Sequence, residues 1–225
     1  MELKSTSSPP PRSPLMRLKR LARPAAPTAH RCELCGAMIA EAHPHLLEIE
    51  SRQLRCACDA CAILFSDQQG QRYRRVAPLL KRLPELQSID GLCGRLHLPI
   101  NLAFFYHSSS AGRVLALYPS PAGAIESLLP MDAWNELLAE APPLAEMQSD
   151  VEALLINQIG ARRDCFLVSI DQCYALVGLI RSRWRGLSGG KDVADAIAGF
   201  FDGLHRRADR AAPRQAQSMR EAAHA

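Results

Sequence analysis

The chain has 225 residues and a formal net charge of +4, and 48% of its residues are apolar. This length and composition suffice for one sizeable hydrophobic core with a small additional module. Its uninterrupted apolar stretches are far shorter than the roughly 18 residues needed to cross a bilayer. The N-terminus is rich in proline where a signal peptide needs an apolar helix. We therefore expect a cytoplasmic protein without a membrane span.

Charge is unevenly distributed along the chain. Residues 1–31 contain seven basic residues and one acidic residue, and residues 203–225 contain five basic and two acidic residues. The body between them contains 15 basic and 20 acidic residues. A basic arm can contact nucleic acid or an acidic partner, but it is also typical of a solvated tail.

The first third of the chain divides into three segments. Residues 1–30 are rich in Pro, Ser, Arg and Ala without apolar periodicity, which predicts a disordered basic arm. Residues 31–66 contain five of the eight cysteines. Residues 67–98 are expected to form a connecting segment, with a short helix around residues 79–83.

Two cysteine pairs in residues 31–66 have the spacing of metal ligands. In each pair, Cys32 with Cys35 and Cys58 with Cys61, two residues separate the thiols, so that a tight turn can aim both at one ion. Gly36 suits the positive φ that such a turn requires. Strand character between the pairs completes the pattern of a zinc ribbon. Four thiolates leave no position for water, so the expected Zn²⁺ is structural, although an iron–sulfur cluster would accept the same ligands.

Cys56 and His45 are possible alternative ligands. Cys56 is a fifth thiol beside the second pair, and His43 and His45 lie between the pairs. Cys56 could replace one of the four ligands, support them from outside, or pack in the hairpin. We favour packing in the hairpin.

Residues 99–207 alternate between strand and helix patterns. Two strand pairs and three helices are expected in the order strand 99–106, strand 113–118, helix 131–141, strand 151–159, strand 165–170, helix 171–184 and helix 191–207. The sequence thus predicts an α+β domain with a mainly antiparallel sheet and two C-terminal helices. Residues 208–225 are expected to be a flexible tail.

The loop between the last two helices is a possible binding loop. It contains Trp184, Arg185, Gly186, Ser188, Gly189 and Gly190. Glycines ahead of a helix N-terminus can hold an anion through backbone N–H groups, but the spacing is not that of a P-loop. A plain helix–helix connection is the alternative.

Five motifs together resemble an uncharacterised bacterial family that contains a zinc ribbon. They are residues 32–36 (CELCG), 54–61 (LRCACDAC), 103–107 (AFFYH), 118–123 (YPSPAG) and 181–190 (RSRWRGLSGG). The resemblance covers about residues 31–205. Members of this family are often encoded beside nickel–iron hydrogenase genes, which implies an accessory role but no known reaction.

We expect a non-enzymatic, metal-stabilised accessory protein that binds a protein partner. By the resemblance, the partner would be a hydrogenase or its maturation machinery. A nucleic-acid-binding regulator is the first alternative. It is less favoured because Glu48, Glu50 and Asp59 offset Arg52 and Arg55 on the cysteine module.

The second alternative is an enzyme with a pocket near His107 and Arg185. His107 is followed by three serines, and a His–Ser pair can act as base and nucleophile. That chemistry also needs an orienting group and an oxyanion site, which the sequence does not identify. A polar hairpin turn explains His107 equally well.

Overall fold

The computed structural model describes residues 30–66, 72–87, 91–186 and 189–222. The expected basic arm, apart from residue 30, lies outside these ranges. Within them, no helix combines the length and the hydropathy needed to cross a membrane.

The N-terminal part forms a small three-stranded antiparallel sheet with one helix, which we call the cysteine module (residues 30–66 and 72–76). Its elements are β1 (His45–Glu48), β2 (Gln53–Cys56), α2 (Asp59–Ser66) and β3 (Tyr73–Val76). The strand order is β2-β1-β3, so β1 is central. In the register, His45 lies opposite Cys56 on one side and Val76 on the other.

The larger part is built on a six-stranded sheet in the order β4-β9-β8-β5-β6-β7, with every neighbouring pair antiparallel. The strands are β4 (Leu80–Arg82), β5 (Leu102–Ser108), β6 (Arg113–Ser120), β7 (Gly123–Ser127), β8 (Glu152–Asn157) and β9 (Asp164–Ser169). The chain is therefore a mixed α/β protein with antiparallel sheets.

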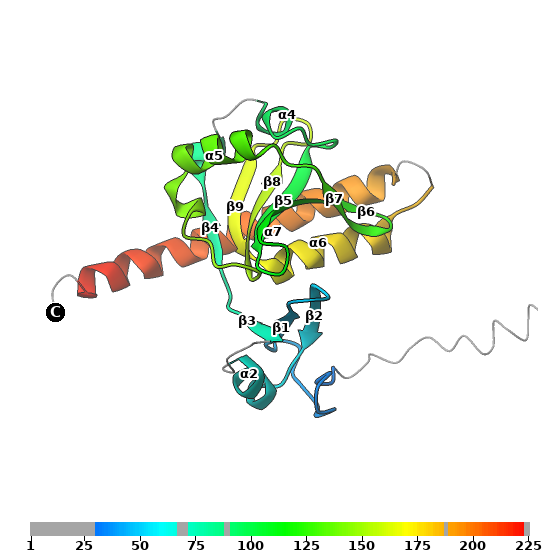
Figure 1. Cartoon of the computed structure of the whole chain (residues 1–225), viewed down its shortest axis with the longest axis vertical. Coiled ribbons are helices and arrows are strands. Elements are labelled where there is room, and N and C mark those ends of the chain that lie inside the picture. The colour runs from blue at the N-terminus through cyan, green and yellow to red at the C-terminus, as the bar shows by residue number, and fades with distance from the viewer. Residues whose placement is uncertain (1–29, 67–71, 88–90, 187–188, 223–225) are drawn as a thin grey trace, which may run out of the picture.

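Helices cover both faces of this sheet (Figure 1). The long helices α6 (Ile170–Arg183) and α7 (Gly190–Ala222) pack on one face. The other face carries shorter helices, which are α3 (Pro84–Gln87), α4 (Leu92–Arg95), α5 (Met131–Glu140) and the 3-10 helix η1 (Pro142–Leu144). Because successive side chains of a strand point to opposite faces, Phe104 packs toward α6 whereas Phe105 stacks on Trp134 of α5.

The cysteine module shares a hydrophobic core with the larger domain. Leu47 of β1 and Val76 of β3 are buried in the same cluster as Phe104, Ile170 and Cys173. The module also has a small cluster of its own around Cys32, Leu46 and Cys61. Buried apolar contacts therefore join the two parts, in addition to the chain that connects them.

Several elements differ from the sequence prediction. Residues 80–82, expected in a helix, form the edge strand β4, because Leu80 pairs with Val168 of β9. The expected connecting segment also supplies β3. Strand β7 replaces part of an expected loop, and α7 continues to Ala222 beyond the expected end at 207. Tertiary pairing overrides weak local preference in such short strands.

Candidate metal centre and neighbouring cavity

The first cysteine pair lies on a turn held by its own backbone. The Gly36 N–H donates to the carbonyl of Cys32, and the Cys32 N–H donates to the carbonyl of Ala37, both at 2.8 Å. Gly36 has φ of 77°, so the predicted positive φ is confirmed. A side chain at this position would be strained.

The second pair opens a helix, which is a correction to the expected turn of a plain ribbon. Cys58 precedes α2 and Cys61 lies in its first turn. The Cys61 N–H donates to Cys58 Sγ at 3.4 Å. Free N–H groups at a helix N-terminus favour thiolates, so this placement suits a metal ligand.

The four sulfurs converge near the N-terminal end of the described chain. The Sγ atoms of Cys32, Cys35, Cys58 and Cys61 all lie within 4.8 Å of one another, and those of Cys35 and Cys58 are 3.7 Å apart. With a zinc–sulfur bond of about 2.3 Å, a tetrahedron has an edge of about 3.8 Å. The spacing therefore fits a tetrahedral ion of this size.

The environment of these thiols also fits a cation. Burial raises the pKa of Cys32, but hydrogen bonds from the backbone at Cys58, Cys35 and Leu34 outweigh it and lower that pKa to about 6. Burial and the neighbouring sulfurs instead raise the pKa of Cys61 to about 12. A bound cation would favour the thiolate form of these cysteines over the thiol.

Cys56 and His45 form a second group with His43. One ring nitrogen of each histidine and the Sγ of Cys56 lie within 4.8 Å of one another. All three residues are half-buried. The structure thus groups the possible alternative ligands with one another and not with the four-cysteine set.

The arginines of the cysteine module are largely paired with carboxylates. Arg55 and Arg72 both bind the buried Glu48, at 2.8 and 2.6 Å. Hydrogen bonds from Arg55, Ser51 and Arg72 lower the pKa of Glu48 to about 2. Because these guanidinium groups already bind a carboxylate, less positive charge is available to bind the phosphates of a nucleic acid.

Polar contacts join the module to the larger domain. His45 Nδ1 lies 3.1 Å from Asp171 Oδ2. Asp171 lies in the first turn of α6. A second polar contact between the two parts is the pair of Arg52 in the module and Glu126 in β7, at 3.4 Å.

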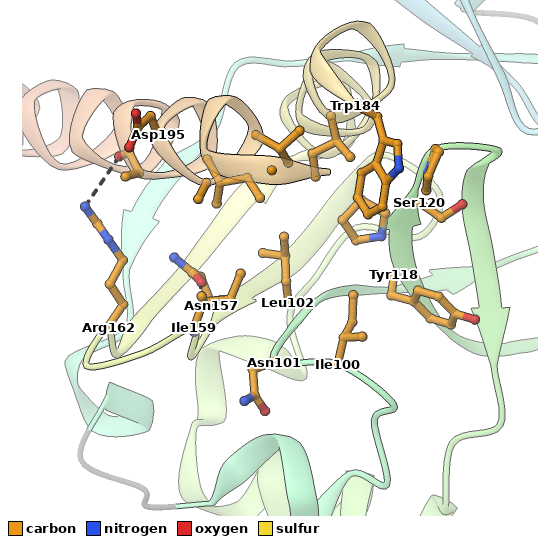
Figure 2. A pocket seen from close by; sticks show the side chains of 18 residues that line it. Ile100, Asn101, Leu102, Tyr118, Ser120, Asn157, Ile159, Arg162, Trp184 and Asp195 are labelled. Atoms are coloured by element: carbon orange, nitrogen blue, oxygen red, sulfur yellow. Dashed lines mark hydrogen bonds between the residues drawn. The ribbon is translucent and has the colours of Figure 1, made fainter. Parts of the chain in front are cut away.

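A cavity of about 670 Å³ lies between α6, α7 and the sheet. Figure 2 shows Trp184, Leu102 and Ile100 on its apolar walls, with Asn157 and Arg162 at one end. Arg162 donates to the backbone carbonyl of Ala198 at 3.4 Å. A cavity of this size, with mostly apolar walls and a few polar groups, is typical of a ligand site.

The expected binding loop borders this cavity only in part. Trp184 and Gly190 line it, whereas Arg185 is exposed and Ser188 lies outside the described residues. The Trp184 ring is half-buried, and its Nε1–H donates to the carbonyl of Gly186 at 2.9 Å. An added Cβ on Gly189 would lie 3.1 Å from the Trp184 ring. Gly186 and Gly189 therefore lie against the Trp184 side chain.

Asn157 and Arg162 were missed by sequence reasoning. They belong to the turn region of β8 and β9, and only the folded chain brings that region beside α7. In the sequence, the one available signal was the polar Asn157 directly after the apolar residues 153–156.

His107 does not line the cavity between α6, α7 and the sheet. His107 lines a different cavity of about 240 Å³ with Trp134, and its Nδ1 lies 3.0 Å from Ser149 Oγ. Neither this cavity nor the one between α6, α7 and the sheet is lined by both His107 and Arg185.

The fold and the site define a mixed α/β protein with antiparallel sheets and a four-cysteine cluster near its N-terminus. The chain belongs to a family of unknown function, DUF5947, whose model matches residues 31–208. No curated protein and no solved structure matches it significantly.

Proposed function

We propose that the protein is a non-enzymatic accessory protein whose zinc-ribbon-like module is held by a structural Zn²⁺. Four thiolates at tetrahedral spacing support zinc, and a small module gains its stability from such an ion. The ion would fix the module against the larger domain through Leu47 and the His45–Asp171 contact.

The observation that carries the binding role is the apolar cavity beneath Trp184. A half-buried Trp beside an exposed Arg is the kind of anchor that dominates protein interfaces. We infer that an apolar segment of a protein partner enters this cavity, while Arg185 pairs with an acidic group at its rim. The sequence resemblance supports a nickel–iron hydrogenase or its maturation machinery as that partner, in the cytoplasm.

A regulator that binds nucleic acid is a weaker candidate. The module's arginines Arg52, Arg55 and Arg72 are paired with Glu126 and Glu48. Binding to phosphates would break these pairs. The basic arm is the remaining feature in favour of this candidate, and its deletion tests it.

The experiment measures binding of the purified chain to the hydrogenase subunits and maturation proteins of its own host. Trp184→Ala and Arg185→Ala should each weaken binding by about thirtyfold or more, since truncation of an anchor costs at least about 2 kcal/mol. Arg75→Ala changes an exposed arginine of β3 and is the control. Circular dichroism checks that each variant is folded.

The outcomes separate the candidates. Deletion of residues 1–29 should leave binding unchanged. If Arg185→Ala binds normally while deletion of the arm abolishes binding, the cavity is not the partner site and the regulator becomes the better hypothesis. If the partner is a nucleic acid, the binding affinity should fall steeply as the salt concentration rises.

A further inference from the structure

The strongest feature that the proposed function does not use is the group formed by His43, His45 and Cys56. These residues offer two imidazoles and one thiolate within 4.8 Å of one another. Imidazole and thiolate are the ligands that borderline divalent transition ions prefer. The group comes from β1, β2 and the segment before β1, so the sheet register holds it together.

Both histidines are oriented by a partner on the same ring nitrogen. His43 Nδ1 lies 2.9 Å from the backbone carbonyl of Ala40, and His45 Nδ1 lies 3.1 Å from Asp171 Oδ2. Both acceptors favour the neutral tautomer that donates from Nδ1, and in that tautomer Nε2 keeps its lone pair. Histidines that bind metals are held in this way by a carbonyl or a carboxylate.

The second ring nitrogen of His43 lacks a partner. Its Nε2 atom is buried and makes no hydrogen bond among the described residues. A buried polar atom without a partner costs about 1–3 kcal/mol, so such an atom needs an explanation. A metal ion would supply the missing partner.

We propose that His43, His45 and Cys56 form a second metal site, separate from the four-cysteine cluster. It would bind a borderline divalent ion such as Zn²⁺ or Co²⁺ through two Nε2 atoms and one Sγ. Three protein ligands leave a fourth position open, so this ion exchanges its remaining ligand with solvent, whereas the ion of the four-cysteine site does not. The proposal does not depend on the proposed partner binding.

The site also connects the metal to helix α6. Asp171 holds His45 from the larger domain and acts as a positioning residue. Loss of such a carboxylate lowers metal affinity by about 10–100-fold. Asp171→Asn should weaken the second site by that factor and leave the affinity of the first site unchanged.

The test counts metal ions in the untagged, reduced full-length chain. After removal of metal, the protein is titrated with Zn²⁺ and, separately, with Co²⁺, and bound metal is measured by mass spectrometry. The wild type should bind two equivalents. His43→Ala, His45→Ala and Cys56→Ser should each bind one, and His107→Ala, a histidine outside both sites, should still bind two.

Retention of one equivalent is also the folding control, because the four-cysteine site requires a folded module. The Co²⁺ absorption of that equivalent should be of the all-thiolate type, and the lost component should be of the imidazole–thiolate type. A wild type that binds one equivalent overturns the proposal whatever the variants do. Loss of both ions in Cys56→Ser alone would place Cys56 in the first site and overturn it as well.

Discussion

His45 and Asp171 are 126 positions apart in the sequence, yet His45 Nδ1 lies 3.1 Å from Asp171 Oδ2. The contact ties the cysteine module to the first turn of α6. It lies beside the buried residues Leu47 and Val76, which extend the core of the larger domain into the module. The cysteine module is therefore coupled to the six-stranded sheet and its helices by both polar and apolar contacts.

Asp171→Ala should lower the free energy of unfolding of the metal-saturated protein by about 1 kcal/mol, because it removes a half-buried hydrogen bond between the two parts. Asp132→Ala is the matched control, since Asp132 is exposed in the first turn of α5. Denaturant titration measures both. Equal losses in the two variants would mean that Asp171 contributes only through the helix terminus.

Chelation of metal should unfold the cysteine module and leave the six-stranded sheet folded but less stable. The sheet keeps a helix-covered core on each face, whereas burial of Leu47 and Val76 is lost, at a cost of at least about 2 kcal/mol. Amide hydrogen exchange checks this. Protection should vanish in β1, β2 and β3 and persist in β5, β8 and β9. Simultaneous loss in both sets would show one cooperative unit instead.

The sequence correctly predicts features that depend only on residues close together in the chain. The spacing of Cys32 and Cys35 and the demand for positive φ at Gly36 are properties of a few neighbouring residues. The apolar run around Phe104 and Phe105 likewise predicted a buried strand. These features followed directly from the sequence.

Long-range pairing determined what was missed. Strands β3 and β4 are short and contain Arg74, Arg75 and Lys81, so their apolar residues do not alternate clearly with polar ones. Their sequence therefore predicts a connecting segment instead of two strands. The grouping of His43 with Cys56 depends on the register of β1 and β2. No local signal marks a contact of that kind.

Gly189→Ala should displace the Trp184 ring. Its Cβ would lie 3.1 Å from that ring, and the residue has φ of 79°. The chain has two tryptophans, so the fluorescence of Trp184 can be followed in a Trp134→Phe background. We expect a shift in its emission and a loss of stability of about 1 kcal/mol or more.

Gly178→Ala is the matched control for this change. Gly178 lies inside α6, and an added Cβ there meets nothing within 4 Å. Alanine should stabilise the helix by about 0.5–1 kcal/mol and leave Trp184 emission unchanged. Unchanged emission in Gly189→Ala as well would contradict the close packing of the loop.

Glu48→Gln should change the pH dependence of stability. The pKa of Glu48 is lowered to about 2 from its ordinary value of 4.5 by Arg55, Ser51 and Arg72. A carboxyl with a lowered pKa stabilises the folded state above its unfolded pKa, and this contribution disappears as the pH falls from 4.5 toward 2.

Denaturant titrations across this pH range provide the check. The wild type should lose stability more steeply than Glu48→Gln, and the two should converge at the acid end. Glu50→Gln changes an exposed neighbour and should follow the wild-type curve. Parallel curves for wild type and Glu48→Gln would show that the arginines do not stabilise the carboxylate.

We propose that Cys32, Cys35, Cys58 and Cys61 together bind one structural zinc ion. X-ray absorption at the zinc edge of the Cys56→Ser variant decides this, because that variant lacks the fifth thiol of the module. The spectrum should show four sulfur ligands at about 2.3 Å and no nitrogen ligand. A zinc ion with mixed sulfur and nitrogen ligands, or a variant without zinc, would contradict the assignment.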